Sequence, residues 1–197
     1  MANWITYPTT LTGKIVELVS LERKHFPELL TLAKDRKIWE YYPYDGSDPV
    51  RLQDILDTAL VERENGTQFP FVIFHKADNK IIGSMRFMDV KVTHKKLEIG
   101  TTWLHPEYWG TKVNLECKLL LLTFCFETLQ AQRVQLRTDE NNIRSRKAIE
   151  KIGGQFEGIL RNDMLKDNNT RRNSAYYSII EEEWKEKKMK LTKLFQS

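Results

Sequence analysis

The sequence predicts an α+β fold in which a mixed central β-sheet is flanked by helices, and three observations lead to it. Segments typical of strands and of helices follow one another in the order β-α-α-β-β-β-α-β-α-β-β. Turns rich in Asp and Asn, at residues 78–79 and 167–169, join two pairs of strands as hairpins. The 197 residues are 41% hydrophobic and show no repeat or linker, so we expect one domain with a substantial core.

The first half of the chain begins with a strand and two helices and continues with three strands. The second helix starts at Asp48-Pro49, because proline is favoured in the first turn of a helix, and it ends at Asn65-Gly66. An aromatic stretch rich in turn residues, 37–47, separates the two helices. The other predicted elements are a strand at 13–21, a helix at 22–36 and strands at 69–76, 80–89 and 97–104.

The second half contains three helices and three strands. A helix at 112–129 is apolar on nearly every face, which predicts that it is buried. An amphipathic helix at 143–152 is stopped by Gly153-Gly154, and a charged helix at 181–195 has only a sparse apolar stripe. The strands of this half are predicted at 133–138, 155–165 and 170–180.

Composition and cysteine spacing narrow the classes of protein. Lys and Arg exceed Asp and Glu by 31 − 27 = 4, which alone does not argue for nucleic acid. Cys117 and Cys125 lie in one apolar helix, a placement that fits neither a disulfide framework nor a zinc knuckle, so we expect two buried thiols and no metal. No signal peptide is visible, and the apolar stretch 119–126 is shorter than the about 20 residues that span a bilayer. We therefore expect a cytoplasmic protein with no nucleic-acid or membrane partner.

Two strand–turn–helix units between residues 103 and 161 carry most of the functional information. In the first, a strand ends at His105-Pro106 and a turn around Gly110 opens the apolar helix. In the second, a strand leads to Asn142-x-x-Ser145 and another helix. A helix N-terminus of this kind presents free backbone N–H groups and favours an anionic phosphate. No Walker-type loop occurs in the chain.

These residues resemble the GNAT superfamily of acyl-CoA-dependent N-acyltransferases, and most of all its branch that acetylates the N-termini of ribosomal proteins. The resemblance is densest over 97–184, and it implies a GNAT domain at 13–184 followed by a helical tail at 185–197. It also implies acetyl-CoA as the cosubstrate. The residues that carry it are Glu98-Ile99-Gly100, His105-Pro106, Trp109-Gly110-Thr111, Val113-Asn114, Glu116, Arg133-Val134, Asn142, Ser145, Lys151, Gly153, Glu157-Gly158, Arg161, Tyr177-Ser178-Ile179 and Trp184.

The phosphate loop departs from the superfamily pattern, which usually has Gln or Arg, two residues, Gly, one residue, and Gly or Ala. The matching positions here are Trp109, Lys112 and Asn114, so Gly110 alone remains of the glycine-rich loop. Lys112 needs a negative φ, which a helix N-terminus permits, and it brings a cation that can pair with phosphate. We expect pyrophosphate binding that depends more on charge than is usual in the family.

The resemblance assigns cofactor-binding roles to residues of both units. The strand at 97–104 is implied to splay from its neighbour and bind the pantetheine arm, with a backbone N–H near Leu104 or His105 polarising the thioester carbonyl. Asn142 is implied to bind the pantetheine arm. An ordinary central strand and a helix N-cap are the structural alternatives. The pyrophosphate is implied to bind the backbone of Gly110, Thr111, Lys112, Val113 and Asn114.

Candidate catalytic groups are Ser145 and Glu98. Ser145 is implied to lie near the sulfur, where it could orient or protonate the leaving thiolate. Glu98 is the leading candidate for the base that deprotonates the amine, and a solvated strand carboxylate is its alternative. His105 is a second candidate base, although a local hydrogen-bond partner is its more usual role.

Two further groups of side chains are ambiguous on sequence alone. Basic residues of the helix at 143–152 could meet the ribose 3′-phosphate or form a solvated face; they are Arg144, Arg146, Lys147 and Lys151. Aromatic residues could line an acceptor pocket or serve packing; they are Trp39, Tyr41, Tyr42 and Tyr44.

Taken together, these features predict an enzyme, an N-acetyltransferase that moves an acetyl group from acetyl-CoA to a primary amine by direct attack in a ternary complex. The amine could be a protein N-terminus or a small molecule, and the protein a monomer or homodimer. The altered phosphate loop leaves a non-catalytic acyl-CoA-binding regulator as the alternative. A third hypothesis, a ribosome- or nucleic-acid-binding module, rests on the net charge of +4 and the lysines of the C-terminal tail. Because the tail mixes Glu with Lys, it is more typical of a solvated helix.

Overall fold

One eight-stranded sheet runs through residues 4–196, the part of the chain that this computed structural model describes. The strands lie in the order β1-β2-β3-β4-β5-β6-β8-β7, and all neighbours are antiparallel except the parallel pair β5 and β6. The predicted mixed sheet is therefore confirmed. The strands are β1 (Thr10–Thr12), β2 (Val16–Ser20), β3 (Phe69–His75), β4 (Lys80–Lys91), β5 (Lys96–Leu104), β6 (Arg133–Asp139), β7 (Gln155–Leu165) and β8 (Arg171–Ile180).

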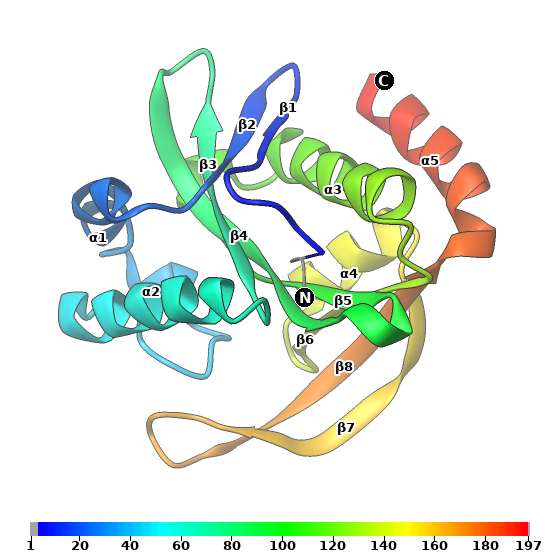
Figure 1. Cartoon of the computed structure of the whole chain (residues 1–197). Helices are drawn as coiled ribbons and strands as arrows, with labels where there is room; N and C mark the ends of the chain where they lie inside the picture. Colours follow the sequence, from blue (N-terminus) through cyan, green and yellow to red (C-terminus); the bar gives the residue numbers. More distant parts are fainter. Residues whose placement is uncertain (1–3, 197) are drawn as a thin grey trace.

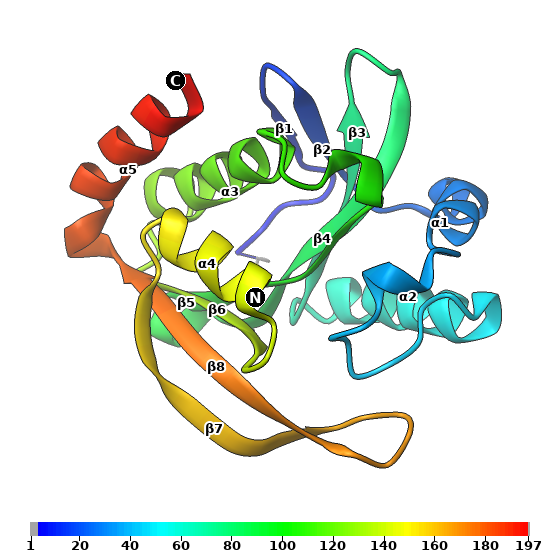
Figure 2. The same ribbon diagram turned by 180° about the vertical axis from the view of Figure 1, so that it is seen from behind.

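Helices cover both faces of this sheet. Figures 1 and 2 show α1 and α2 grouped on one side of the molecule and α3, α4 and α5 on the other, while the β7–β8 hairpin projects as a long ribbon. The helices are α1 (Phe26–Leu32), α2 (Pro49–Glu64), α3 (Val113–Thr123), α4 (Ile143–Lys151) and α5 (Glu181–Gln196). The flanked-sheet architecture predicted from the element order is confirmed.

Two hydrophobic cores fill the layers. On one face, Leu29 of α1 and Leu56 of α2 pack with Val72 and Trp103 of the sheet. On the other face, the larger core joins α3, α4 and α5 to the sheet through residues such as Leu121, Ile149, Leu191 and Tyr177. Sheet residues alternate between the two cores, as the period-2 geometry of a strand requires.

The N-terminal region differs from the prediction in its elements. The predicted strand at 13–21 is β2, and the sheet begins with the unpredicted β1. The predicted helix at 22–36 is a 3-10 turn at Arg23–His25 followed by α1, which ends at Leu32. The turn between β1 and β2 is held from outside: the Glu116 carboxylate of α3 accepts the N–H groups of Lys14, Ile15 and Val16 at 2.6, 2.8 and 2.8 Å.

The apolar helix predicted at 112–129 is α3 extended by a π-helical turn at Phe124–Thr128. Cys117 and Cys125 are both fully buried and unbridged, as expected. Burial raises the pKa of the Cys117 thiol to about 12, so the thiol stays protonated and inert.

The C-terminal helix α5 is continuous from Glu181 to Gln196. Trp184 and Leu191, on either side of the predicted boundary at 184/185, are both buried in the same core. The division into a domain at 13–184 and a tail stays a prediction about independent folding. Among residues 4–196, no helix combines the length and the apolar composition that a bilayer crossing would require.

Candidate active site

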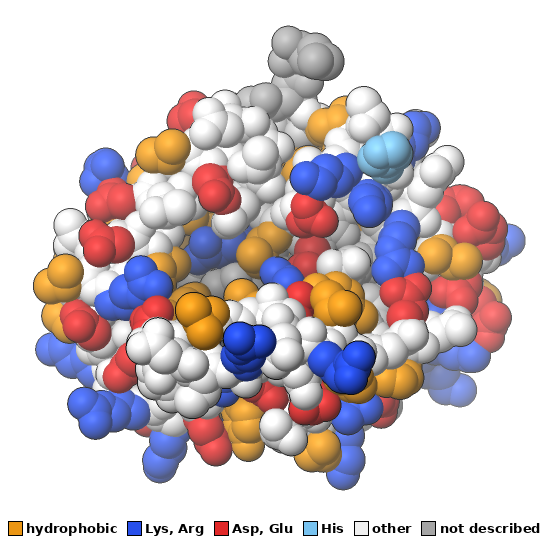
Figure 3. All heavy atoms as spheres, turned by 90° about the horizontal axis from the view of Figure 1, so that it is seen from below, with side chains coloured by type: hydrophobic (Ala, Val, Ile, Leu, Met, Phe, Trp, Pro, Cys, Tyr) orange, Lys and Arg blue, Asp and Glu red, His pale blue; other side chains and the backbone are white. Residues whose placement is uncertain are grey.

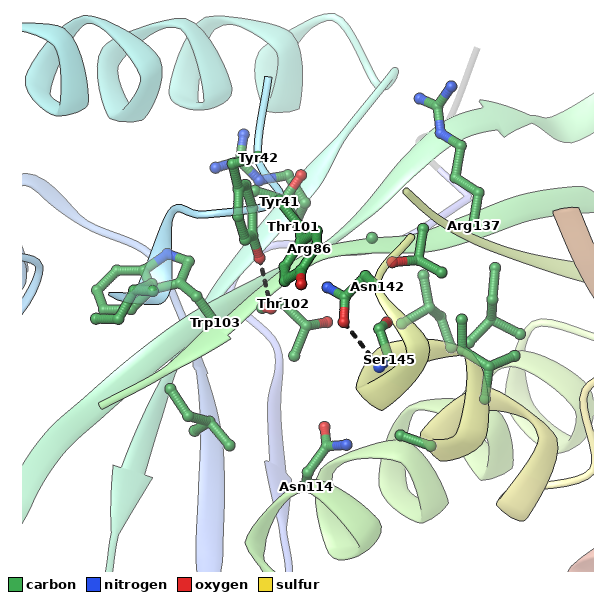
Figure 4. A pocket seen from close by; sticks show the side chains of 18 of the residues that line it. Tyr41, Tyr42, Arg86, Thr101, Thr102, Trp103, Asn114, Arg137, Asn142 and Ser145 are labelled. Atoms are coloured by element: carbon green, nitrogen blue, oxygen red, sulfur yellow. Dashed lines mark hydrogen bonds between the residues drawn. The ribbon is translucent and has the colours of Figure 1, made fainter. Parts of the chain in front are cut away.

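A cavity of about 880 Å³ opens where β5 and β6 separate. Parallel pairing of these strands is confined to Lys96–Arg133, Leu97–Val134 and Glu98–Gln135, after which they diverge. The splay implied by the family resemblance is therefore present. The cavity is also lined by the loop before α2, by β4 and by the first turns of α3 and α4, and Figure 4 shows side chains from these elements turned toward it.

A bulge in β5 shapes the wall of the cavity. Ser84 faces Trp103 and Arg86 faces Gly100, so that Met85 of β4 stands opposite two residues of β5. One of these two, Thr101, has a φ of 46°. A β-branched residue rarely adopts this conformation, which marks the bulge as a locally strained part of the site.

The backbone of Leu104 and that of His105 point in different directions. The His105 N–H donates to Ile82 O at 2.9 Å, so it belongs to the β4–β5 ladder and is not free to polarise a carbonyl. His105 is also absent from the cavity lining, and its ring lies 3.4 Å from the Glu107 carboxylate. The His105 N–H is therefore not free for the oxyanion role, because alternation along a strand turns it toward β4 and turns the Leu104 N–H toward the cavity. Any other contact of His105 with the cofactor stays a prediction.

The turn before α3 brings four of its five predicted residues to the cavity. Gly110 takes a φ of +75°, a conformation suited to glycine, and lines the cavity with Thr111, Lys112 and Asn114. Lys112 has the negative φ, −72°, that was predicted. Val113 differs, because its side chain is 2% exposed and packs in the core. Any contact of Val113 with a ligand is thus through its backbone.

Two polar side chains of α3 lie one helical turn apart on the floor of the cavity. Asn114 Oδ1 is buried and has no hydrogen-bond partner among residues 4–196. Lys118 is 6% exposed, and its Nζ donates to Thr102 Oγ1 at 2.8 Å. Burial lowers the pKa of Lys118 to about 8. Sequence reasoning missed Lys118, although a lysine inside an otherwise apolar helix is a visible signal for a functional group.

The start of α4 supplies the second unit of the site. Asn142 is the N-cap of α4, the structural alternative considered for it, since its Oδ1 accepts the Ser145 N–H at 3.0 Å. Its amide NH₂ group remains available on the cavity side. Ser145 lines the same cavity. The structure thus brings Asn142 and Ser145 together with Leu104 and the turn before α3.

The basic residues of α4 divide into two groups. Arg144 and Lys151 line the cavity, and the Arg144 guanidinium lies 3.7 Å from the ring centre of Trp109. Arg146 instead donates to Tyr177 Oη at 2.9 Å, and Lys147 is exposed. The cluster predicted as one unit is therefore half cavity wall and half structural or solvated.

Glu98 lies on the cavity wall, but its carboxylate is already engaged. It is 3% exposed and accepts hydrogen bonds from Gln135 Nε2 at 2.8 Å and Arg137 Nε at 3.0 Å. Arg137 also pairs with Asp163 at 3.2 Å. The alternative of a solvated strand carboxylate is wrong, because Glu98 is a buried member of an ion-pair network.

The aromatic stretch after α1 serves both packing and the cavity. Trp39 is 4% exposed, and its indole N–H donates to Ala33 O, so it is a core residue. Tyr41, Tyr42 and Tyr44 line the cavity, and Tyr42 Oη donates to Thr102 O at 2.5 Å. Burial raises the pKa of Tyr42 and keeps its phenol neutral. Figure 4 shows Tyr42 reaching β5 from this stretch.

Two arginines on the same side of the cavity were not predicted. Arg86 of β4 is 5% exposed and Arg172 of β8 is 8% exposed, and both line the cavity. They lie on strands far apart in the sequence, and neither belongs to a recognisable sequence motif. Figure 3 looks onto the lower face of the molecule, where Lys and Arg side chains lie inside a central hollow.

Comparisons with known proteins agree with this geometry. The family profile described as "Acetyltransferase (GNAT) domain" matches residues 16–155. The Bacillus subtilis (strain 168) protein YdaF, provisionally named a ribosomal N-acetyltransferase, is 31% identical over 111 residues, which are 56% of this chain and 60% of YdaF. The chain is thus aligned with less than two thirds of that relative.

Solved structures share the fold over nearly their whole length. A crystal structure from T. thermophilus, provisionally described as an acetyltransferase, has a TM-score of 0.86 and 29% identity, and the match covers 96% of this chain and 98% of that one. RimJ of Mycobacterium smegmatis, solved in complex with CoA-disulfide, has a TM-score of 0.82 at 20% identity, covers 95% of each chain, and supports the fold alone. The chain belongs to the acetyltransferase (GNAT) domain family.

Proposed function

We propose that this protein is an N-acetyltransferase that transfers an acetyl group from acetyl-CoA to a primary amine by direct attack in a ternary complex. The observation that carries the proposal is one cavity of about 880 Å³ that contains both the diverging edge of β5 and the N-terminal turns of α3 and α4. An extended thioester with a phosphorylated end needs these two environments side by side.

The cavity wall fits a ligand of this chemistry. Four cationic lining residues belong to α3 or α4 or cap α3, on the side proposed for the phosphates; they are Lys112, Lys118, Arg144 and Lys151. Asn114 Oδ1 is a buried acceptor that has no partner among the described residues, and a bound ligand can supply one. Acetyl-CoA, when bound, supplies an activated acetyl group and a thiolate leaving group.

The phosphate end has a defined place in this proposal. The backbone N–H groups of residues 110–114 and the dipole of α3 favour the pyrophosphate, and Lys112 adds a full positive charge. Arg144 and Lys151 lie on the α4 side of the cavity, where they can pair with the remaining phosphate. Because Gly110 keeps the turn open and Lys112 is comfortable at its φ, the glycine-poor loop does not favour the non-catalytic alternative.

The reacting end lies between Leu104 and Ser145. The Leu104 N–H can donate to the carbonyl oxygen as negative charge develops there, and its own C=O is fixed by the Trp109 indole N–H at 2.9 Å. Ser145 is placed to give a proton to the departing sulfur while a bond forms between the amine nitrogen and the acetyl carbon. The C–S bond breaks as the C–N bond forms, and the neutral amine loses one proton. That proton replaces the one that Ser145 gives to the departing sulfur, so the reaction is balanced.

The role of Glu98 as general base remains a prediction. Both of its oxygens accept hydrogen bonds, from Gln135 and Arg137, so it can receive a proton only if one of these donors is displaced or a water relays it.

We also retain, as part of the proposal, a cytoplasmic location and an acceptor that is a protein N-terminus or a small amine. The relative named for ribosomal acetylation supports the former kind of acceptor.

Calorimetry with acetyl-CoA and a thiol-release assay across amines and N-terminal peptides test this function. We expect saturable binding and release of one CoA thiol per acetylated amine. A protein that is neither bound nor thermally stabilised by acetyl-CoA would contradict the proposal. If acetyl-CoA binds but no amine in the panel releases CoA thiol, the result would support a non-catalytic acyl-CoA-binding regulator instead.

A further inference from the structure

We infer that the acceptor recognised by this cavity carries a carboxylate near its reactive amine, and that Arg86 and Arg172 bind this carboxylate. The inference rests on the proposed function and adds the chemical class of the acceptor. The two sources of such a group are a free amino acid and the acidic side chain of a peptide N-terminus, and both present the same chemistry.

Arg86 is a buried cation on which the Glu62 carboxylate acts only from a distance. Its Nη1 donates to the neutral Gln68 Oε1 at 3.1 Å, its Nε has no partner, and it makes no ion pair within the described chain. A charge removed from water without a counter-ion is strongly unfavourable. The fold therefore maintains a guanidinium at the cavity wall at a cost that an anionic ligand would offset.

Arg172 is likewise a buried cation that makes no ion pair among the described residues. Its Nη1 donates to Tyr41 O at 3.3 Å, and its Nε has no partner in residues 4–196. Two carboxylates act on it from a distance, but Asp139 is paired with Lys166 and Asp163 with Arg137.

Burial lowers the pKa of both arginines below its ordinary value, yet an arginine remains charged at neutral pH. Each guanidinium thus keeps unused donors in a region where water is restricted. The planar guanidinium group presents its N–H donors in a geometry that matches the two oxygens of a carboxylate.

The two arginines lie near Tyr42, beside the proposed reacting end of the cavity. Both act electrostatically on Tyr42, whose hydroxyl holds Thr102 O on β5, two residues before Leu104. The proposal puts the phosphates of acetyl-CoA at the N-termini of α3 and α4, on one face of the sheet. Arg86 and Ser84 lie on the other face, because Ser84 pairs with Trp103, which packs in the core under α1 and α2. An anion held by Arg86 and Arg172 therefore belongs to the second substrate.

The other cationic side chains on this side of the cavity already form ion pairs. Arg51 pairs with Asp167 at 2.9 Å, and Arg137 pairs with Glu98 and Asp163. Asp54, the remaining acidic residue of the lining, is solvent-exposed on α2. The excess positive charge is thus localised on Arg86 and Arg172.

The test compares matched acceptors that differ in one charge. C-terminally amidated peptides beginning with Asp or Glu are compared with those beginning with Asn or Gln, and glycine is compared with glycinamide, in the thiol-release assay. We expect the charged member of one pair to have a kcat/KM at least about 30-fold higher, the size typical of a buried charge pair. The pair that shows the preference identifies the source of the carboxylate.

The variants Arg86→Met and Arg172→Met should abolish this preference through KM while acetyl-CoA binding is unchanged. Arg171→Met is the matched control, because Arg171 is the exposed neighbour of Arg172 and is not part of the cavity lining. It should keep the wild-type preference. Arg86→Met should also melt no lower than the wild type, since it removes an unpaired buried charge; a structural arginine would give a lower Tm.

Three outcomes would overturn the inference: equal use of charged and neutral acceptors, a preference that survives in both variants, or a large loss of Tm in Arg86→Met. Acetyl-CoA binding is measured separately, so its failure is a failure of the proposed function alone. In that case calorimetry of the Asp and Asn peptides with the free protein still tests the carboxylate site directly.

Discussion

At the scale of single residues, Lys118 shows how a buried charge links stability to the site. Its pKa is lowered to about 8 by burial, against an ordinary value of 10.5, so the folded state binds this proton less tightly than the unfolded state. By linkage, Lys118 destabilises the fold fully below pH 8, and this penalty disappears as the pH rises toward 10.5.

Lys118→Met is therefore expected to be more stable than the wild type at pH 7. The difference in unfolding free energy between the two proteins should shrink by roughly 3 kcal/mol between pH 7 and pH 10.5, at about 1.4 kcal/mol per pKa unit. Denaturant titrations at several pH values measure it. Lys147→Met, at an exposed position of α4, is the control and should show no such pH dependence. A constant difference between Lys118→Met and the wild type would contradict the assignment.

Asn142 allows capping and ligand binding to be separated. Asn142→Ala should destabilise the protein by about 1 kcal/mol, because the Ser145 N–H loses its acceptor. Asn142→Asp keeps an acceptor for that N–H but lacks the amide donor, so its stability should stay near that of the wild type while acetyl-CoA affinity falls. Urea titration and calorimetry give the two quantities. If Asn142→Asp binds acetyl-CoA normally, Asn142 is only a cap.

Single residues also show what the sequence could and could not predict about the site. Gly110, Lys112, Asn142 and Ser145 follow from local motifs, and the structure brings them to one cavity. The sequence could not tell that the His105 N–H is paired with β4, because the direction of a strand N–H depends on register. Arg86 and Arg172 needed the three-dimensional proximity of β4 and β8 to the loop that carries Tyr42.

At the scale of elements, long periodic segments were predicted well and short or externally stabilised ones were not. The predicted helix from Asp48-Pro49 to Asn65-Gly66 matches α2, whose Asp48 side chain caps its first turn. β1 was missed because three residues have too little pattern. Its turn into β2 depends on Glu116, about a hundred residues later, which local sequence signals cannot reveal.

Glu116 gives a prediction at this scale. Its carboxylate is 3% exposed and accepts three backbone N–H groups, and a Cβ on Gly13 would lie 2.5 Å from its carboxyl carbon. Glu116→Gln should cost about 2–4 kcal/mol, because the amide NH₂ faces the same donors and the charge is lost. Glu186→Gln on the exposed face of α5 is the control, with an expected change below about 0.5 kcal/mol. Equal stability of the two variants in urea would show that Glu116 does not hold this turn.

At the scale of the whole molecule, the order of the elements predicted the class of fold, and the packing of the sheet determined the site. Strand order places β5 beside β6 although α3 separates them in the sequence, and the divergence of this parallel pair creates the cavity. Hydrophobic periodicity indicates that α3 is buried but not which strands it covers. The position of α5 against α3 and β8 was equally invisible, because its apolar stripe is sparse.

The contribution of α5 tests whether residues 13–184 form a unit of their own. Leu191 is 2% exposed in the same core as Leu121 and Tyr177, and Lys187 Nζ donates to Gly153 O at 2.6 Å after α4. A chain that ends at residue 184 loses both contacts and uncovers one face of α3, so we expect it to fold poorly. Since a truncation can fail for several reasons, the point variant Leu191→Ala is the sharper measurement: it should cost about 2–5 kcal/mol, as for other large buried side chains cut to alanine. Met189→Ala, at a position 62% exposed on the same helix, is its control and should change stability by less than about 0.5 kcal/mol. If Leu191→Ala and the truncated chain both keep wild-type stability in urea, α5 is a dispensable tail; if both lose it, the helix is part of the fold that holds the cavity in shape.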